Sequence, residues 1–246
     1  TLERESILGL KFDTPLIMGA LNITPDSFSD GGLFFEETKA YDQAKLMINS
    51  GATIIDIGGE STRPGSKTVD EKSEWERVKN IIIKLKKNFP KVLLSLDTRK
   101  SQVMSNGIKN GIDIINDVSG LNFDKKSFDI INLKKKPFIL HHMQGTPATM
   151  QNNPTYEDVL LDIFDFFEKK INFCIKKNYR KEFIILDPGI GFGKNLDHNL
   201  RLMSKISIFH SLGCPILIGT SRKRFIEQIV TKFDTPDRTG GTLASV

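Results

Sequence analysis

The stretch Met18-Gly-Ala-Leu-Asn-Ile-Thr-Pro-Asp-Ser-Phe-Ser-Asp-Gly-Gly32 changes character at its middle. Residues 16–21 are apolar and predict a short buried strand. Residues 22–32 are mostly polar, contain Gly and Pro, and predict a long loop. A buried strand that leads into a loop rich in side-chain oxygens suits an ion or phosphate site, but an ordinary surface loop has the same composition. The stretch alone leaves both interpretations open.

The same change from apolar strand to polar loop recurs along the chain. Apolar runs predict further strands at 53–57, 92–96, 113–115, 138–140, 183–186 and 215–218. Amphipathic segments predict helices at 36–50, 69–88, 101–110, 124–133 and 195–212. Thr155, with Asp158 three residues later, predicts the capped start of one more, long helix. Counting a last strand-then-helix step that begins at 215–218, these make seven units, which predict parallel strands joined by crossover helices.

The strand ends favour one kind of parallel sheet. A doubly wound open sheet concentrates its chemistry at one switch point, whereas nearly every predicted strand here ends in Asp, Asn, His or Gly. A (β/α)8 TIM barrel builds its site from all the loops at the carboxyl ends of its strands, and we therefore expect that α/β fold. The eighth βα unit is missing from the sequence, so the expectation is a single barrel domain over residues 1–246 that is incomplete at its C-terminus.

Composition excludes several functional classes. No apolar run is long enough to cross a bilayer, so no membrane association is expected. The net charge of +5 lies largely in helical lysine runs without interleaved aromatics, which argues against a nucleic-acid partner and is compatible with anionic small substrates. Cys174 and Cys214 are far apart in apolar surroundings, which predicts free buried thiols and a reducing, cytoplasmic compartment.

Polar residues at the strand ends form the candidate site. The residues that follow or end the predicted strands are Asn22, Asp56, Asp97, Asn116, Asp117, His141, His142, Asp187, Ser221 and Lys223. Buried carboxylates need donors, and the amino and ring N–H groups of a guanidine-like heterocycle edge supply them. Each Asp could instead cap the helix that follows it. Several such residues at strand ends favour a nitrogen-heterocycle site.

Two loops have the composition of a phosphate site. Glu60-Ser-Thr-Arg-Pro-Gly65 and Thr220-Ser-Arg-Lys223 combine hydroxyls, cations and backbone donors ahead of helices. The Gly189-Ile-Gly-Phe-Gly193 spacing lacks a full dinucleotide fingerprint. Metal binding by the adjacent His141 and His142 is disfavoured, because neighbouring strand residues point to opposite faces; a packed or hydrogen-bonding role is preferred.

Long motifs along the chain resemble one enzyme family. These motifs are Asn22-Ile-Thr-Pro-Asp-Ser-Phe-Ser-Asp-Gly-Gly32, Asp56-Ile-Gly-Gly-Glu-Ser-Thr-Arg-Pro-Gly65, Ser95-Leu-Asp-Thr98, Ile115-Asn-Asp-Val-Ser-Gly120, Asp187-Pro-Gly-Ile-Gly-Phe-Gly-Lys194 and Ser221-Arg-Lys223. In this order they resemble dihydropteroate synthase, the sulfonamide target of folate biosynthesis. The resemblance implies a transferase that condenses 6-hydroxymethyl-7,8-dihydropterin diphosphate with 4-aminobenzoate and releases pyrophosphate.

The resemblance also implies roles for individual residues. It places Asp97, Asn116, Asp187 and Lys223 on the pterin, with Asp97 and Lys223 in the catalytic role. It implies that the pterin slot is shaped by Met143, Phe192 and Gly219. It implies that the diphosphate meets Asn22, Thr62 and Arg63, with Asn22 also binding Mg2+. It implies that the aminobenzoate lies near Phe28, Arg63, Pro64 and Lys223.

The resemblance further implies a dissociative reaction, in which pyrophosphate leaves and a pterin cation is stabilised near Asp97 before the aniline nitrogen attacks. It implies Mg2+ on the diphosphate, competition by sulfonamides, and a helix-mediated homodimer. Two alternatives remain at this point. One is a methyltransferase domain that binds methyltetrahydrofolate, and the other is a truncated barrel that binds pterin without turnover.

Overall fold

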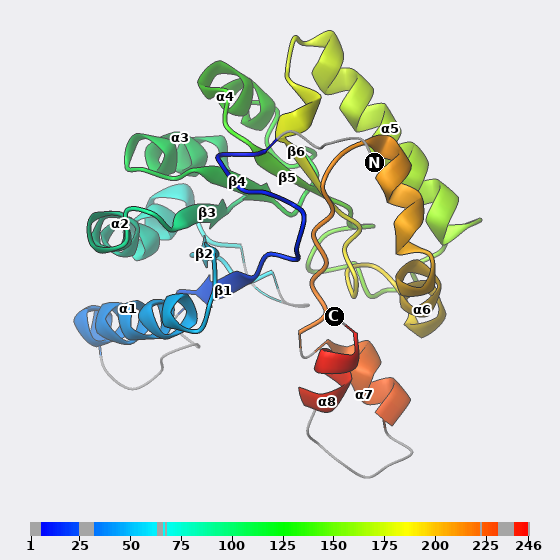
Figure 1. Ribbon diagram of the computed structural model, residues 1–246, viewed down its shortest axis with the longest axis horizontal. Helices are drawn as coiled ribbons and strands as arrows, with labels where there is room; N and C mark the ends of the chain where they lie inside the picture. The colour runs from blue at the N-terminus through cyan, green and yellow to red at the C-terminus, as the bar shows by residue number, and fades with distance from the viewer. Residues whose placement is uncertain are drawn as a thin grey trace. The chain divides into compact units, whose positions relative to one another are not determined.

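The computed structural model describes residues 6–24, 32–62, 66, 68–221, 223–230 and 239–245. Strands and helices alternate along most of this chain, as predicted (Figure 1). The strands are β1 Met18–Asn22, β2 Ile54–Gly58, β3 Leu93–Asp97, β4 Ile114–Asp117, β5 Phe138–His141 and β6 Ile184–Asp187. The helices are α1 Gly32–Asn49, α2 Glu71–Asn88, α3 Ser101–Lys109, α4 Ser127–Lys134, α5 Val159–Lys176, α6 Leu196–Ser204, α7 Arg224–Val230 and α8 Thr239–Ala244, with 3-10 turns η2 Lys181–Phe183 and η3 Ile206–Leu212.

The order of the strands identifies the type of sheet. Each strand pairs with its neighbour along the chain, in the order β1-β2-β3-β4-β5-β6, and the registers from β1 to β4 are parallel. A doubly wound sheet reverses its strand order at a switch point, whereas a barrel adds strands consecutively. The consecutive order is therefore that of the predicted TIM barrel. The seventh predicted strand, 215–218, forms one parallel bridge, between Leu186 and Ile216.

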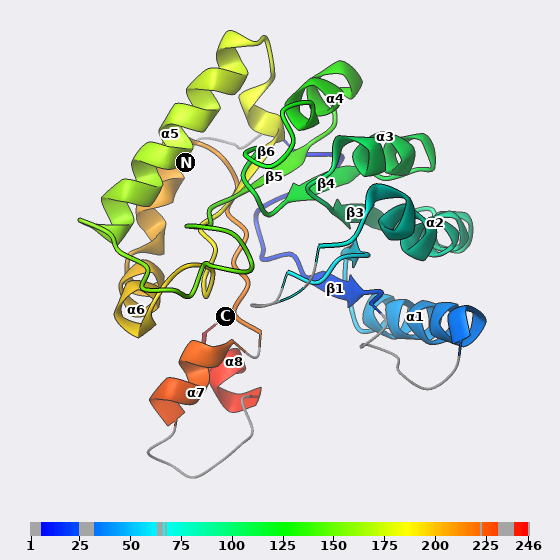
Figure 2. The same cartoon turned by 180° about the vertical axis from the view of Figure 1, so that it is seen from behind.

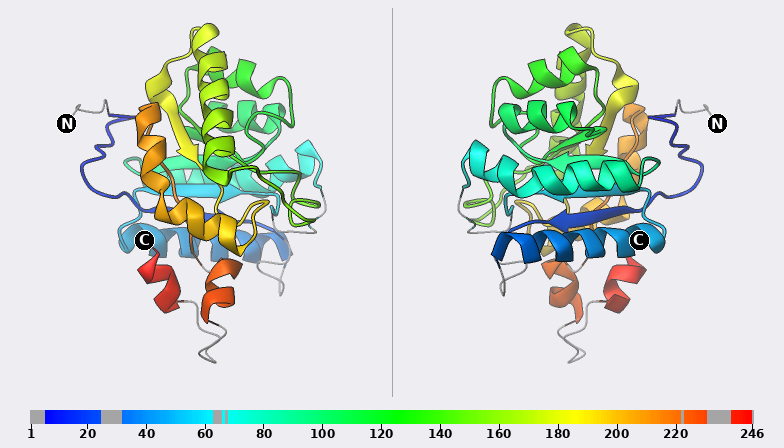
Figure 3. Two further views of the ribbon diagram at one scale, coloured as in Figure 1. Left: turned by 90° about the vertical axis from the view of Figure 1, so that its right-hand side faces the viewer. Right: turned by 90° about the vertical axis from the view of Figure 1, so that its left-hand side faces the viewer.

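The chain divides into two compact units, Thr1–Thr62 with Ser66–Ile139 and Arg63–Gly65 with Leu140–Val246. In the first unit, α1 to α4 lie in sequence along the outer face of β1 to β4, as Figure 2 shows from behind. In the second unit, α5 contacts α6 and η3, and α7 lies beside α8 (Figure 3). The expectation of one domain over residues 1–246 stays a prediction.

The helices begin and pack for identifiable reasons. Helix α2 begins where the Asp70 side chain accepts a hydrogen bond from the Ser73 backbone N–H at 2.9 Å. The spacing of Trp75, Val78, Ile82 and Leu85 predicts one inward face for this helix. Val78, Ile82 and Leu85 are buried, but Trp75 is only half-buried and the neighbouring Glu74 is fully buried. The strands beneath it contribute a mostly aliphatic core.

The expected cap of helix α5 is wrong. The Asp158 carboxylate accepts from the backbone N–H groups of Leu160 and Leu161, whereas the Thr155 N–H donates to the Gln144 side chain. Helical spacing predicts an inward face for this helix, and all residues of that face are buried: Leu160, Ile163, Phe167, Ile171 and Cys174. They include Cys174, which is a free thiol like Cys214. Burial raises the pKa of the Cys174 thiol to about 12. Within the described part of the chain, no helix combines the length and apolar character needed to span a membrane.

Candidate active site

Three of the predicted site residues share one row across the first unit. The parallel registers align Asn22 of β1 with Gly58 of β2, Gly58 with Asp97 of β3, and Asp97 with Asn116 of β4. Because parallel strands end at the same edge, this row lies at the carboxyl edge of the sheet. A Cβ at Gly58 would lie 3.4 Å from Asn22 Oδ1 and 3.5 Å from Asp97 Oδ2. Asn22 and Asp97 therefore border the space that the absent Gly58 side chain leaves.

A second polar pair accompanies this row. Asn116 Nδ2 donates to Asp56 Oδ2 at 2.9 Å, and both residues are buried. Asn116 Oδ1 is also buried and has no hydrogen-bond donor among the residues that the structure describes. A buried acceptor without a donor carries a desolvation cost, which a ligand N–H group would relieve. The pair can therefore both donate to and accept from a polar heterocycle.

The electrostatic surroundings of Asp97 are unfavourable for its charge. Burial raises the pKa of the Asp97 carboxyl well above its ordinary value, and the nearby carboxylates of Asp56, Glu74, Asp117 and Glu60 raise it further. A carboxyl among other carboxyls gains most from a ligand that brings hydrogen-bond donors or positive charge. This is the property expected of the group that holds the guanidine-like edge of a heterocycle.

Asp117 has a different role from the one expected at a strand end. Its Oδ1 accepts from the Ser119 N–H at 2.9 Å and from Ser119 Oγ at 2.6 Å, and its Oδ2 accepts from the Leu121 N–H. Burial raises the pKa of the Asp117 carboxyl, against these hydrogen bonds. Asp117 therefore stabilises the turn after β4, and it does not cap the next helix, α4, which begins ten residues later.

In the second unit, Asp187 organises the turn after β6. Asp187 Oδ1 accepts from the Gly189 N–H at 2.8 Å, and the Asp187 carbonyl accepts from the His142 N–H at 2.9 Å. Gly189 has φ +69°, and a Cβ there would lie 2.0 Å from the His142 carbonyl oxygen. Only glycine fits this position. His141 Nε2 lies 3.9 Å from Asp187 Oδ2, so the ends of β5 and β6 are tied together.

Lys223 lies against the loop that follows Asp187. Its Nζ donates to the Ile190 carbonyl at 2.7 Å and lies 4.2 Å from the centroid of the Phe192 ring. Burial lowers the pKa of Lys223 to about 8, although Asp187 acts in the opposite direction. Phe192 also meets the His141 ring edge-on at 4.6 Å. The structure thus brings together Asp187, Phe192 and Lys223, three residues that the motif resemblance assigns to the pterin.

Side-chain donors hold the carbonyls of this glycine-rich loop. Besides Lys223 on Ile190, Gln151 binds the Gly191 carbonyl, Lys194 that of Phe192, Tyr156 that of Gly193, and Asn199 that of Lys194. These donors come from α6, from the segment between β5 and α5, and from the loops around the site. The loop conformation is therefore fixed before any ligand binds, which favours precise binding.

Lys194 is a buried cation for which the sequence predicted no role. This residue is 3% exposed, and its Nζ lies 3.1 Å from His142 Nδ1. Burial lowers the pKa of Lys194 to about 7, and burial lowers that of His142 to about 2, so His142 is neutral and accepts the bond. The hydrogen-bonding role preferred for this histidine is confirmed. Across the described ranges, no cluster of three or more His, Cys, Asp or Glu residues is placed to hold a metal ion.

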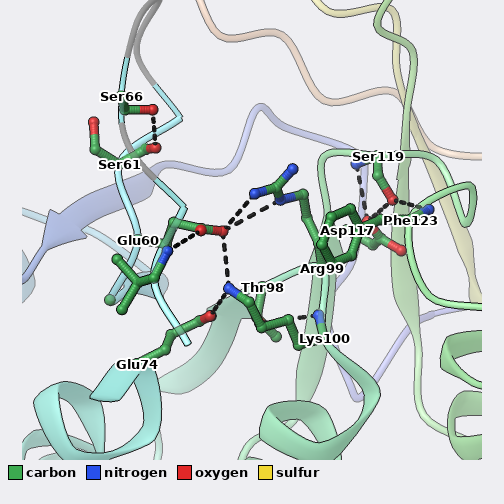
Figure 4. Close-up of polar contacts among 12 residues, drawn as sticks. Glu60, Ser61, Ser66, Glu74, Thr98, Arg99, Lys100, Asp117, Ser119 and Phe123 are labelled. Carbon is green, nitrogen blue, oxygen red and sulfur yellow. Dashed lines mark hydrogen bonds and ion pairs between the residues drawn. The ribbon is translucent and has the colours of Figure 1, made fainter. Parts of the chain in front are cut away.

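Four buried charged residues near the first row were not expected. Glu60, Glu74, Arg99 and Lys100 are at most 7% exposed and form ion pairs with one another (Figure 4). One signal could have indicated Glu74, because it lies four residues before Val78 on the apolar stripe of its helix. The other three lie two or three residues after the ends of β2 and β3.

For the remaining predicted site residues, the structure gives the degree of exposure. Met143 and Thr62 are half-buried, and Gly219 and Ser221 are exposed. Phe28, Arg63 and Pro64 lie outside the residues that the structure describes.

Comparison with known proteins identifies the family. The profile of the "Pterin binding enzyme" family matches residues 18–246. The dihydropteroate synthase of Escherichia coli K12 is 42% identical over 235 residues, which are 96% of this chain and 82% of that protein. This chain belongs to the dihydropteroate synthase family of pterin-binding enzymes. It is accordingly a transferase, and the synthase interpretation prevails over the methyltransferase alternative.

Solved structures of dihydropteroate synthases have the same fold as this chain. A Yersinia pestis dihydropteroate synthase with a sulfonamide drug complex matches with a TM-score of 0.89 and 40% identity, over 98% of this chain and 87% of that one. The Xanthomonas albilineans dihydropteroate synthase with 4-aminobenzoic acid also has a TM-score of 0.89, with 35% identity, over 100% of this chain and 88% of that one. The TIM-barrel prediction is confirmed.

Proposed function

We propose that this chain, as a member of the dihydropteroate synthase family, binds pterin, and that each unit contributes residues to that role. In the first unit, Asp97 and Asn116 would bind the amino-pyrimidine edge. The observation that carries this assignment is the raised pKa of the Asp97 carboxyl beside a buried Asn116 Oδ1 that accepts from no donor among the described residues. An N–H-rich heterocycle edge would satisfy both groups.

In the second unit, Asp187 and Lys223 would bind the pterin, and Phe192, Met143 and Gly219 would shape its slot. The contact between Lys223 and the Phe192 ring supports this role, because an aromatic face beside a cation suits a flat, polar ring. Lys223 would also border the aminobenzoate together with Phe28, Arg63 and Pro64. Its low pKa of about 8 leaves it able to act as a donor at neutral pH.

The proposed reaction is a substitution at the exocyclic methylene of the pterin. The bond between this carbon and the diphosphate oxygen breaks, and pyrophosphate leaves with the electron pair. The resulting pterin cation is stabilised electrostatically by Asp97. The amino nitrogen of 4-aminobenzoate then forms the new carbon–nitrogen bond and loses a proton. The described residues supply charge stabilisation and positioning, and no protein nucleophile is required.

A magnesium ion fits the donor set on the diphosphate side. Asn22 presents an exposed side-chain oxygen at the end of β1, beside the space at Gly58. Mg2+ typically takes one or two protein oxygens and fills its other positions with water and substrate phosphate oxygens. Asn22 would hold the ion, with Thr62 and Arg63 on the diphosphate. When bound, Mg2+ would neutralise charge on the leaving group.

Two further assignments belong to this proposal. We place the enzyme in the cytoplasm, because its two cysteines are buried free thiols. We also propose a homodimer, as the motif resemblance implies. Sulfonamides should compete with 4-aminobenzoate, and a binding assay that found no competition would contradict this expectation.

The proposed function is tested by measuring pyrophosphate release from pterin diphosphate. We expect release that requires 4-aminobenzoate and Mg2+ and that yields dihydropteroate in equal amount. Release without aminobenzoate would indicate simple hydrolysis. Tight pterin binding without release would indicate the binding-only alternative.

A further inference from the structure

Hydrogen bonds tie together the two ends of the segment that follows strand β2. The Val69 N–H donates to Glu60 Oε1 at 2.9 Å, so the residues that flank segment 61–68 are joined directly. Inside the segment, Ser66 Oγ donates to the Ser61 carbonyl at 2.6 Å (Figure 4). Thr62 lies immediately after Ser61. The Glu60 carboxylate therefore holds Val69 beside the start of the backbone that carries Thr62.

The Glu60 carboxylate is itself anchored by two cations. Arg99 donates to Glu60 Oε2 from Nε at 3.2 Å and from Nη2 at 2.8 Å, and Lys100 Nζ lies 3.1 Å from the same oxygen. Lys100 also forms an ion pair with Glu74 of helix α2. Burial alone would raise the pKa of Glu60, but the hydrogen bonds from Val69, Arg99 and Lys100 lower it. Glu60 is thus a charged anchor that links the loops after β2 and β3.

Stability does not explain a buried arrangement of this kind. Burying four charged groups costs desolvation free energy, and apolar residues of similar volume often stabilise a protein equally well. Glu74 Oε1 is buried without a hydrogen-bond donor in the described part of the chain, so part of that cost remains. Charge-assisted hydrogen bonds do provide short and directional geometry, which apolar contacts lack. The arrangement is therefore better suited to fixing the position of a backbone segment.

We propose that Glu60 is a positioning residue for the synthase reaction. Anchored by Arg99 and Lys100, Glu60 holds Val69 through a hydrogen bond and thereby places Thr62, two residues after Glu60, against the diphosphate. This inference rests on the proposed function, in which Thr62 binds that group. Glu60 acts through the backbone and does not touch the pterin, which the separate row of Asp97 and Asn116 binds.

The variant Glu60→Gln tests this role. Glutamine keeps the size of the side chain and an acceptor for the Val69 N–H, but it removes the charge that Arg99 and Lys100 bind. We expect the KM for pterin diphosphate and the Kd for inorganic pyrophosphate to rise about tenfold to a hundredfold, as small misplacements of binding groups do. The Kd for 6-hydroxymethylpterin without a diphosphate should stay within about twofold of wild type.

Asp113→Asn is the matched control. Asp113 accepts from Lys86 Nζ at 2.7 Å and from the Leu94 N–H at 2.9 Å, so it also combines a lysine with a backbone donor. It precedes strand β4, at the opposite end of the strand from Asn116. This variant should leave both dissociation constants and the KM unchanged.

Arg99→Met provides a second test should Glu60→Gln fail to fold, because it leaves Lys100 on Glu60. We expect the same selective loss of pyrophosphate affinity, to a smaller extent. Unchanged pyrophosphate affinity in the folded variants would overturn the inference, and so would an equal loss of pterin and pyrophosphate affinity. A wild-type protein that binds pyrophosphate but forms no dihydropteroate would instead contradict the proposed function.

Discussion

Asp97 ends strand β3, and Arg99 and Lys100 follow it by only two and three residues. These side chains nevertheless belong to two regions, one in which carboxylates are paired with cations and one in which they are not. In the region of Glu60 and Glu74, the two carboxylates are paired with the two cations. In the row of Asn22, Asp97 and Asn116, Asp97 forms no ion pair with any residue that the structure describes, and burial raises its pKa. The carboxylates of the paired region have compensating cations without a ligand, whereas the row becomes favourable only when a ligand supplies donors.

The largest effect is expected from breaking the paired region. Lys100→Met should lower the free energy of unfolding by about 3–5 kcal/mol, because it leaves Glu60 and Glu74 with less compensating charge in a buried site. Urea-induced unfolding measures this change. Lys86→Met serves as the control, since the Lys86–Asp113 pair is more exposed and should contribute about 1 kcal/mol or less. Equal losses in the two variants would remove the proposed distinction between the paired region and an ordinary ion pair.

A substitution in the row should lower activity without lowering stability, in contrast to one in the paired region. Asp97→Asn should lower kcat by about a hundredfold to a thousandfold, because it removes the charge that stabilises the pterin cation. Its melting temperature should equal or exceed that of wild type, since an unfavourable buried carboxylate is gone. Steady-state kinetics and thermal unfolding on the same preparation measure both quantities. Unchanged turnover would refute the role of Asp97.

The dependence of stability on pH sharpens the same contrast. Because the folded state raises the pKa of Asp97, it holds this proton more tightly than the unfolded chain does. The contribution of Asp97 to stability is therefore greatest below about pH 4, and it is lost as the pH rises through the raised pKa. The difference in melting temperature between Asp97→Asn and wild type should accordingly grow from pH 4 upward. A difference that shrinks with rising pH would indicate that the pKa of Asp97 is lowered.

The smallest effects are expected at two adjacent glycines that belong to the two regions. A Cβ at Gly59 would lie 2.8 Å from the Glu74 carbonyl oxygen, so Gly59→Ala should cost about 1–3 kcal/mol of stability. A Cβ at Gly58 makes only ordinary contacts, so Gly58→Ala should cost about 1 kcal/mol or less. Gly58→Ala should instead raise the Mg2+ concentration needed for half-maximal activity, because it narrows the space between Asn22 and Asp97. A larger loss of stability for Gly58→Ala than for Gly59→Ala would contradict this prediction.

Much of the fold could be predicted from local sequence patterns. Apolar runs and amphipathic stripes depend on neighbouring residues, and they located the six described strands to within a few residues. The helix caps were harder to predict, because Thr155 and Asp158 are both residue types that cap helices. In the structure Asp158 caps α5, and the Thr155 N–H donates to the Gln144 side chain instead. The predicted 195–212 helix ends earlier, at Ser204, and continues as the 3-10 turn η3.

The sequence alone determined the alternation of strands and helices, the polar strand ends and the motifs of the family, because these follow from periodicity and residue type. Only the tertiary structure decided which charges meet. Strand register placed Asp97 beside Asn116, and the turn after β3 directed Arg99 and Lys100 to Glu60 and Glu74 instead of to Asp97. The contact of Lys194 with His142 likewise joins residues 52 positions apart. Charge pairing depends on distances in space, which neither composition nor spacing along the chain specifies.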